Sequence, residues 1–194
     1  MRVQVKPLNQ YPWYLRPFFW NQRRRYGAVL EPALLWARSP SLFTTVALLY
    51  GALDRRSSPI EAPLRSLVTV RVSQINWCAF CVDINSATLL KRGVSQAKVA
   101  ALSQWRTSDL FDDRERAALD YAEKMTDPAK GVDDGVMGRL RRHFDDDGIV
   151  ELTGLVAFQN LSSKFNAALD VPPQGFCAVP TASLGSAEKE QALP

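Results

Sequence analysis

Apolar residues recur at every third or fourth position along most of this chain, which is the spacing of one face of an α-helix. The clearest stretch covers residues 61–75, and the positions at helical spacing within it are Leu64, Leu67, Val68, Arg71, Val72 and Ile75. Its valines would also suit a strand, but the length and spacing favour a helix. Because no hairpin turn joins two alternating segments and no strand–helix–strand order occurs, the sequence predicts a single-domain, all-α fold.

Capping residues and helix breakers divide the rest of the chain into further helices. We expect two helices within residues 28–53, with Pro40 opening the second. Asn76 is expected to cap a helix over about residues 77–91 that ends at Gly93. The other expected helices are 96–105 after Ser95, 114–124 after Asp112 or Asp113, 135–143 after Asp133, and 149–169 after Asp146 or Asp147.

The two ends of the chain differ in composition from the helical domain predicted over residues 28–172. Residues 1–27 are rich in proline and aromatic residues, and the prolines are expected to limit helix there to short pieces. We interpret this segment as an arm that packs its aromatic rings on its own domain or on a sister subunit. A segment that binds a membrane surface or a partner is the alternative. Residues 173–194 are rich in Pro, Gly and Ser and predict a flexible tail.

The overall composition indicates a globular protein rather than a nucleic-acid-binding or membrane protein. The 194 residues are 46% hydrophobic and 23% charged, with a net charge of +4. This charge is too small to argue for nucleic-acid binding, and no zinc finger or other nucleic-acid-binding motif is present. No run approaches the roughly 18 apolar residues of a membrane span, and the first residues do not form a signal peptide. We therefore expect a cytoplasmic, reducing environment.

Two of the three cysteines form a Cys-x-x-Cys motif, at Cys78 and Cys81. If Asn76 caps the following helix, Cys78 lies in its first turn, where the free backbone N–H groups and the helix dipole stabilise a thiolate. A spacing of three residues places both sulfurs on one helix face. Asn85 lies one turn beyond Cys81 on the same face, where its side chain can hydrogen-bond Cys81 or a substrate.

Three interpretations of the thiol pair remain open: a redox-active dithiol, half of a structural metal site, and buried inert thiols. The metal site is disfavoured because zinc usually takes four ligands, and only Cys177 and His143 remain. His143 is expected near a helix C-terminus, where a positive group suits the dipole, and Cys177 lies in the predicted tail. Val82 replaces the histidine of a haem-attachment motif, and a thioredoxin fold would need strands. We favour the redox dithiol and expect neither a metal nor a cofactor.

The chain resembles the carboxymuconolactone decarboxylase / alkylhydroperoxidase-D-like superfamily in the run from Arg65 to Asn85, which contains the two cysteines. Downstream segments are similar to those of the peroxidase-related members: 114–122, 149–153 and 164–166. The resemblance covers about residues 28–172.

This resemblance implies an all-helical protein that assembles as a homo-oligomer and reduces hydroperoxides with the cysteine pair. In the peroxidase members the second cysteine attacks the peroxide and the first resolves it as a disulfide, so Cys81 would attack and Cys78 would resolve. A dithiol protein or a small dithiol would then regenerate the pair. Decarboxylase members act on a muconolactone without this motif, so its presence here argues against that activity.

The resemblance also implies a proton relay that this chain lacks. The pattern has a glutamate twelve residues before the first cysteine and a histidine four after the second, and these positions hold Ser66 and Asn85. Neither side chain acts as a general acid or base near neutral pH. Asp83 is the nearest carboxylate, but it is expected on another side of the helix, and Glu61 reaches the site only if the fold brings it there. Ordinary surface charge is the simpler interpretation of both.

We therefore expect a thiol-dependent oxidoreductase that reduces a hydroperoxide or another small molecule. The alternative is a member of the same fold that binds a ligand or partner while its thiols stay idle.

Overall fold

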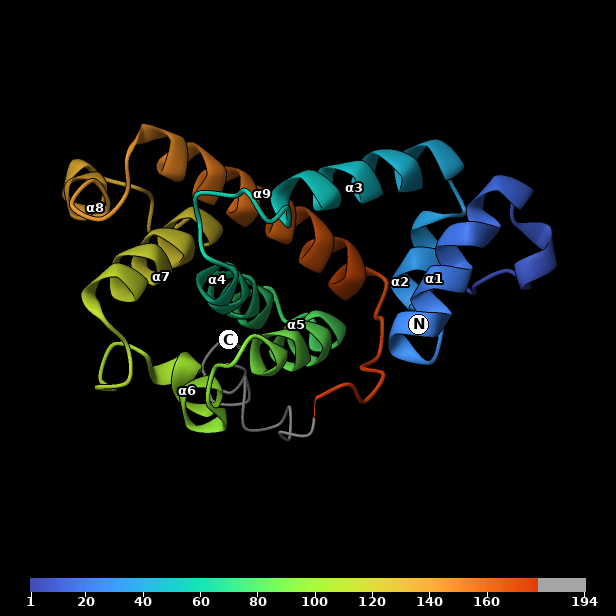
Figure 1. Ribbon diagram of the computed structural model, residues 1–194, viewed down its shortest axis with the longest axis horizontal. Helices are drawn as coiled ribbons and strands as arrows, with labels where there is room; N and C mark the ends of the chain where they lie inside the picture. Colours follow the sequence, from blue (N-terminus) through green and yellow to red (C-terminus); the bar gives the residue numbers. More distant parts are fainter. Residues whose placement is uncertain (178–194) are drawn as a thin grey trace.

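The computed structural model describes residues 1–177, and within them the chain is helical with no strand, which confirms the all-α prediction (Figure 1). Short 3₁₀ helices precede α1 (Leu8–Gln10 and Trp13–Leu15) and follow α6 (Ala101–Gln104). The α-helices are α1 (Arg16–Tyr26), α2 (Glu31–Trp36), α3 (Pro40–Leu53), α4 (Ala62–Ile75), α5 (Ala79–Lys91), α6 (Gln96–Ala100), α7 (Asp113–Thr126), α8 (Asp134–Leu140) and α9 (Asp146–Ala168).

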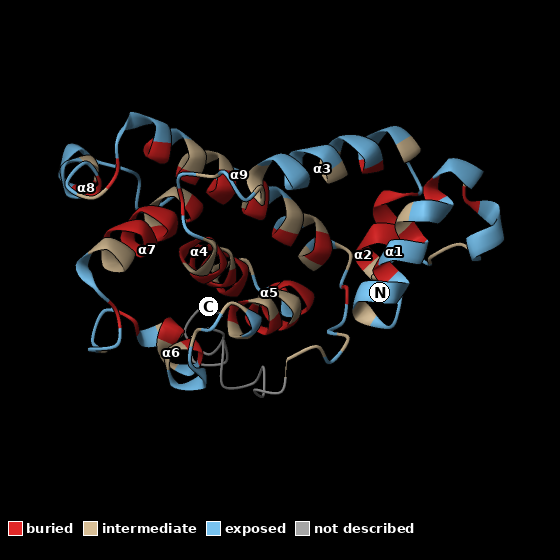
Figure 2. Ribbon diagram, in the orientation of Figure 1, coloured by how far each residue is buried: buried red, intermediate tan, exposed pale blue. Residues whose placement is uncertain are grey.

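Helix α4 lies at the centre of the molecule and is buried on nearly all sides (Figure 2). Helices α5, α7 and α9 pack around it. A helix that is buried all round needs apolar residues on more than one face, which explains the valines that made this stretch resemble a strand. The sequence pattern therefore gave the correct element, and tertiary packing explains its composition.

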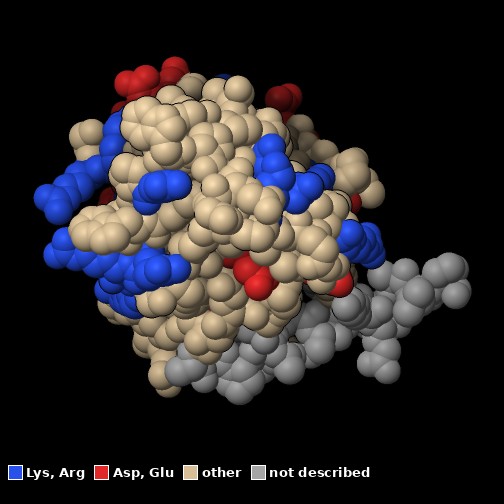
Figure 3. All heavy atoms as spheres, turned by 90° about the vertical axis from the view of Figure 1, so that its right-hand side faces the viewer, with Lys and Arg blue, Asp and Glu red and all other residues tan. Residues whose placement is uncertain are grey.

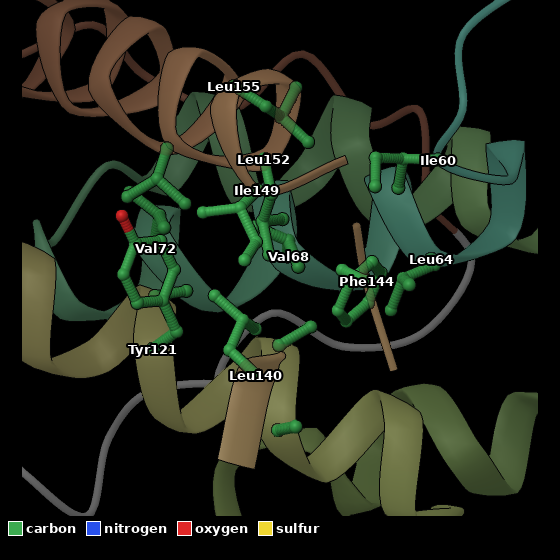
Figure 4. Packing of buried hydrophobic residues seen from close by; sticks show 14 of the residues in the cluster. Ile60, Leu64, Val68, Val72, Tyr121, Leu140, Phe144, Ile149, Leu152 and Leu155 are labelled. Carbon is green, nitrogen blue, oxygen red and sulfur yellow. The ribbon is translucent and has the colours of Figure 1, made fainter. Parts of the chain in front are cut away.

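Two hydrophobic clusters meet on α4. Val68 and Val72 pack against α7, α8 and α9, where Leu140, Ile149 and Leu152 fill the space between helices (Figure 4). Another face of α4 packs against residues of α5, α6, α7 and the turns between them: Leu67 and Val70 contact a cluster of Val82, Leu89, Val99, Leu102, Trp105, Phe111 and Leu119. Together the clusters hold α4 in one position.

A buried ion pair also joins α4 to α7. Arg71 Nε donates to Glu123 Oε1 at 2.6 Å, and the same carboxylate accepts hydrogen bonds from Trp105 Nε1 at 2.7 Å and Arg106 Nη2 at 2.8 Å. Burial alone would raise the pKa of Glu123, but the Arg71 charge and the hydrogen bonds from Trp105 and Arg106 outweigh it and lower the pKa. Glu123 therefore stays ionised inside the protein.

The observed helix starts correct two of the expected caps. Asp112 and Asp133 cap α7 and α8 as predicted, Asp112 through a reciprocal capping box with Glu115. Helix α9 is capped by Asp145, one residue before the expected pair, because the Asp145 carboxylate accepts the Gly148 N–H. Helix α5 is capped by Cys78 rather than Asn76.

The expected helix over residues 96–105 is also divided, into α6 and a 3₁₀ turn at Ala101–Gln104. Ser95 caps α6 as predicted, through its hydroxyl and the Lys98 N–H.

The N-terminal segment contains more helix than expected. Pro17 lies in the first turn of α1, where proline is tolerated, so the helix runs for 11 residues. The side chains of Tyr11, Leu15 and Phe19 are buried against α2 and α3, while Trp13 and Trp20 are exposed. Viewed from this side, Lys and Arg side chains surround a largely uncharged surface (Figure 3). No helix within residues 1–177 combines the length and apolar character needed to cross a bilayer.

We predict that the substitution Glu123→Gln lowers the free energy of unfolding by roughly 3 kcal/mol at pH 7, because a neutral amide replaces the buried carboxylate that accepts hydrogen bonds from Arg71, Trp105 and Arg106. Glu151→Gln is the matched control: it removes the ion pair with the partly exposed Arg55 and should cost less than about 1 kcal/mol. Urea unfolding of both variants measures the difference, and equal losses would contradict the prediction.

The same pair predicts a pH dependence. Because the folded-state pKa of Glu123 lies below its usual value of 4.5, its ionised form contributes fully above that pH and its contribution is lost as the pH falls through the folded-state pKa. The stability difference between wild type and Glu123→Gln should therefore shrink below about pH 4.5. Urea titrations from pH 7 to pH 3 test this, and a difference that grows on acidification has the wrong sign.

Candidate functional site

The two cysteines lie where α4 turns into α5. The chain leaves α4 through Trp77, which has a φ of 54°, and Cys78 N–H then donates to Ser73 O at 3.1 Å. This turn places Cys78 at the N-cap of α5, where its Sγ accepts the Cys81 N–H at 3.2 Å. Asn76, the expected cap, instead donates to Asn160 of α9 at 2.8 Å. In the reduced protein the helix N-terminus would stabilise a thiolate at Cys78 through this N–H group.

The two cysteines form a disulfide, with their Cα atoms 5.2 Å apart. Cys78 is 1% exposed and Cys81 is 3% exposed. They share a hydrophobic cluster with residues from both ends of the described chain: Met1, Val3, Val5, Val171 and Phe176 belong to it. The pair is therefore oxidised and largely covered by the N-terminal residues and by the chain that follows α9.

Asn166, in the last turn of α9, holds the Cys81 sulfur. Its Nδ2 donates to Cys81 Sγ at 3.3 Å, while its Oδ1 is buried and has no hydrogen-bond partner in the described part of the chain. The side chain is 2% exposed. Sequence reasoning did not assign this residue a role, although Asn166 ends the third downstream segment on which the family resemblance was based. Its contact joins positions 85 residues apart, and no local spacing indicates such a pair.

Cys81 lines a cavity of about 240 Å³ between α1, α2, α3, α5 and α9, which we call the Cys81 cavity. Its wall combines aliphatic and polar side chains with the aromatic rings of Phe18, Tyr26, Trp36, Phe43, Tyr50, Phe80 and Phe158. The amides of Asn85 and Asn166 also line it. Among residues 1–177, the one charged side chain in its wall is Arg25, and no carboxylate lines it. Cys78 does not line this cavity, so of the two bonded sulfurs it is Cys81 that faces it.

Of the two positions of the missing relay, one lines the Cys81 cavity and the other does not. Asn85 lines the Cys81 cavity, but its Nδ2 donates to Ser73 Oγ at 3.3 Å rather than to Cys81. Ser66 is buried on α4 and accepts a hydrogen bond from Arg92 Nη1 at 2.8 Å. It lines a small neighbouring cavity whose wall also includes Asn85.

Asp83 does not lie on the surface, contrary to the simpler interpretation of its charge. It is 1% exposed, and its carboxylate accepts backbone N–H groups from Gln174 at 2.9 Å, Gly175 at 2.8 Å and Cys177 at 2.7 Å. Three donors satisfy the buried charge. Asp83 thus fastens residues 174–177, the start of the predicted tail, to α5; residues 178–194 lie outside the described structure.

The remaining titratable candidates do not reach the Cys81 cavity. Glu61 forms an ion pair with Arg114, whose hydrogen bond lowers the Glu61 pKa. His143 lines a separate polar cavity between α7 and α8, after the C-terminal end of α8. No group of three or more His, Cys, Asp or Glu side chains within the described part of the chain is arranged to hold a metal ion.

Tyr50 is a titratable group in the cavity wall. The residue is 47% exposed; partial desolvation, together with the nearby Asp54 carboxylate, raises the pKa of Tyr50 to about 12. Tyr50 therefore stays protonated at neutral pH and does not act as a base. The surroundings of Cys81 consist of aromatic carbon, amides and hydroxyls, with one cation.

Comparison with known proteins supports the family and the helical fold that the sequence resemblance indicated. Residues 40–124 match the model of the carboxymuconolactone decarboxylase family. The uncharacterized protein YnjA of Escherichia coli (strain K12) is 45% identical over 176 residues, covering 91% of this chain and 97% of its own length.

Two solved structures share the fold. One is the alkylhydroperoxidase AhpD core of an uncharacterized peroxidase-related protein from Ralstonia eutropha JMP134, with a TM-score of 0.79, 24% identity, and coverage of 90% of this chain and 93% of that one. The other is the debrominase Bmp8, also with a TM-score of 0.79 and 24% identity, covering 94% of this chain and 95% of that one. The family match, the extensive similarity to YnjA and the shared helical fold around Cys78 and Cys81 show that this chain belongs to the carboxymuconolactone decarboxylase family and has the alkylhydroperoxidase-D-like fold.

Proposed function

We propose that this protein is a thiol-dependent oxidoreductase that reduces an organic hydroperoxide through Cys81 and Cys78. The observation that carries this proposal is the asymmetry of the pair. Cys81 faces the cavity and accepts a hydrogen bond from Asn166, whereas Cys78 lies behind it at the N-cap of α5. This arrangement suits an attacking sulfur and a resolving sulfur within disulfide distance.

The reaction begins from the reduced pair. The Cys81 thiolate attacks the terminal oxygen of the hydroperoxide, the O–O bond breaks, and Cys81 becomes a sulfenic acid while the alkoxide takes a proton to leave as an alcohol. The Cys78 thiolate then attacks the Cys81 sulfur, forming the disulfide and releasing water after protonation. A dithiol reductant, either a protein or a small molecule, supplies the two electrons that restore both thiols.

The helix terminus and the amides would assist this chemistry without a histidine. The Cys81 N–H stabilises charge on Cys78, and Asn166 Nδ2 stabilises charge on Cys81. Since no carboxylate or imidazole among residues 1–177 lines the cavity, water would supply the proton that the alkoxide takes. We expect a slower peroxidase than one equipped with a proton relay.

A second candidate function is ligand or partner binding with idle thiols. Its supporting observation is the burial of both sulfurs under the N-terminal residues and residues 171–177. A protein reductant needs access to a disulfide sulfur, so this covering segment must move before the pair can be recycled.

We also propose that the protein assembles as a homo-oligomer in a reducing, cytoplasmic compartment. Large apolar side chains are exposed along α3 and α9: Leu42, Leu48, Leu49, Val150 and Leu161. Side chains of this kind along adjoining helices suit an interface with a second copy of the chain. Analytical ultracentrifugation of wild type and Leu48→Glu would measure this assembly, and a monomeric wild type would contradict it.

We predict that Cys81→Ser abolishes consumption of cumene hydroperoxide in the presence of dithiothreitol, because the attacking sulfur is lost. Cys78→Ser should keep a first turnover but lose rapid cycling, since Cys81 then lacks its resolving partner. Cys177→Ser is the control and should retain wild-type consumption. Equal rates for wild type and Cys81→Ser would overturn the proposed activity.

We predict that Asp83→Asn speeds reduction and subsequent alkylation of the Cys78–Cys81 pair. An amide cannot accept the three backbone N–H groups that the carboxylate holds, so residues 174–177 should be released from α5. The exposed Asp147, in the first turn of α9, provides the control variant Asp147→Asn. Mass spectrometry after timed reduction and iodoacetamide labelling measures the rate. Unchanged labelling in Asp83→Asn would show that this contact does not limit access, and resistance to alkylation in every variant would favour the idle-thiol function.

A further inference from the structure

Asn166 lines the Cys81 cavity and carries a buried hydrogen-bond acceptor that has no partner among residues 1–177. Asn166 donates its Nδ2 to Cys81, and its Oδ1, on the same amide, has no partner within residues 1–177 although the residue is 2% exposed. A buried polar atom without a partner is costly, and in a binding site it is satisfied when a ligand brings the missing group. A ligand that offers an O–H or N–H to this oxygen would have that group beside the Cys81 sulfur.

The walls of the cavity restrict the rest of the ligand to a small apolar body. Aromatic rings enclose the cavity from several helices, including Phe18 of α1, Phe80 of α5 and Phe158 of α9. A volume of about 240 Å³ is below the usual range for drug-sized ligands, so a single ring with small substituents is the appropriate scale. Flat rings pack against aromatic walls with favourable edge-to-face or offset geometry.

The charge of the cavity favours an anionic ligand. Arg25 is the one charged side chain of its described wall, and within residues 1–177 it has no carboxylate partner. Its guanidinium lies 5.4 Å from the centre of the Tyr26 ring. The Arg25 side chain is exposed, so it is available to a carboxylate at the solvent side of the cavity. Its neighbour Arg24 lies over Trp20 instead and does not line the cavity.

We propose that the Cys81 cavity binds a small aromatic anion that donates an O–H or N–H group to Asn166 Oδ1 and directs its negative charge toward Arg25. For the peroxidase reaction, the donor would be the hydroperoxide O–H, which places the terminal oxygen next to Cys81 for attack; after that oxygen has passed to the sulfur, the hydroxyl of the alcohol product would take the donor's place. This inference rests on the proposed function only in taking Cys81 as the reacting sulfur.

Binding of four small probes to the oxidised, full-length protein tests the proposal without requiring turnover. Isothermal titration calorimetry at pH 7 compares 4-hydroxybenzoate with 4-methoxybenzoate, which lacks the donor, with phenol, which lacks the anion, and with 4-hydroxycyclohexanecarboxylate, which lacks the aromatic ring. We expect 4-hydroxybenzoate to bind about tenfold more tightly than each of the others, the effect of losing one well-placed interaction. Binding of 4-methoxybenzoate or phenol as tight as that of 4-hydroxybenzoate, or no binding by any probe, would overturn the proposal.

Two variants assign the preferences to residues. Asn166→Ala should remove the preference for hydroxyl over methoxy, and Arg25→Gln should remove the preference for 4-hydroxybenzoate over phenol. Arg24→Gln is the matched control and should keep both preferences. Preferences that persist in Asn166→Ala and Arg25→Gln would contradict the assignment. If Asn166→Ala fails to fold, the comparison of probes on the wild-type protein still decides the ligand class.

Failure of the proposed function gives a different result from failure of this inference. A protein that shows the four-probe preference but consumes no hydroperoxide retains the binding site and loses the peroxidase assignment. A protein that consumes cumene hydroperoxide but does not distinguish the probes retains the peroxidase assignment and loses the proposed ligand class.

Discussion

The burial of α4 among three other helices is the constraint on which the rest of the structure depends. A charged group on a helix in this position needs a buried partner, and Arg71 has one in the Glu123 carboxylate, which also accepts hydrogen bonds from Trp105 and Arg106. The valines of the same helix fill the space toward α9 and α5. One element thus joins the two hydrophobic clusters and a buried ion pair, and its position determines where the following turn begins.

That turn determines the chemistry of the two cysteines. Because α4 is held on all sides, Ser73 O is in place to accept the Cys78 N–H, and Cys78 becomes the N-cap of α5. The packing of α9 against α4 and α5 brings Asn166 to the other sulfur. The result is an asymmetric pair, with one sulfur at the helix terminus and the other facing an aromatic cavity, in a site where amides stand in place of an acid–base relay.

The segment that follows α9 and covers the disulfide is held in place by a buried carboxylate. Asp83 lies two residues after Cys81, and its carboxylate holds the backbone of residues 174–177 against α5. A buried carboxylate that receives three N–H groups is a strong attachment for a short segment, while the bonds themselves join only a few residues of chain. The contact therefore protects the oxidised pair through three hydrogen bonds that lie outside the two hydrophobic clusters of the helical core.

Much of the fold could be predicted from the sequence, because helix periodicity and caps are local. The periodicity of residues 61–75 determined α4, Asp112 and Asp133 determined the starts of α7 and α8, and the Cys-x-x-Cys spacing determined that two sulfurs could meet. The predicted cap of α5 was wrong. Asn76 was expected there, but its side chain contacts Asn160 instead, and Cys78 takes the cap position. The roles of Asp83 and Asn166 could not be predicted from local sequence for the same reason, since their hydrogen-bond partners lie about 90 residues away in the chain. The sequence by itself therefore determined the helices and the thiol pair, and only the tertiary structure decided which sulfur faces a cavity and which residues surround it, because those contacts depend on how distant helices pack.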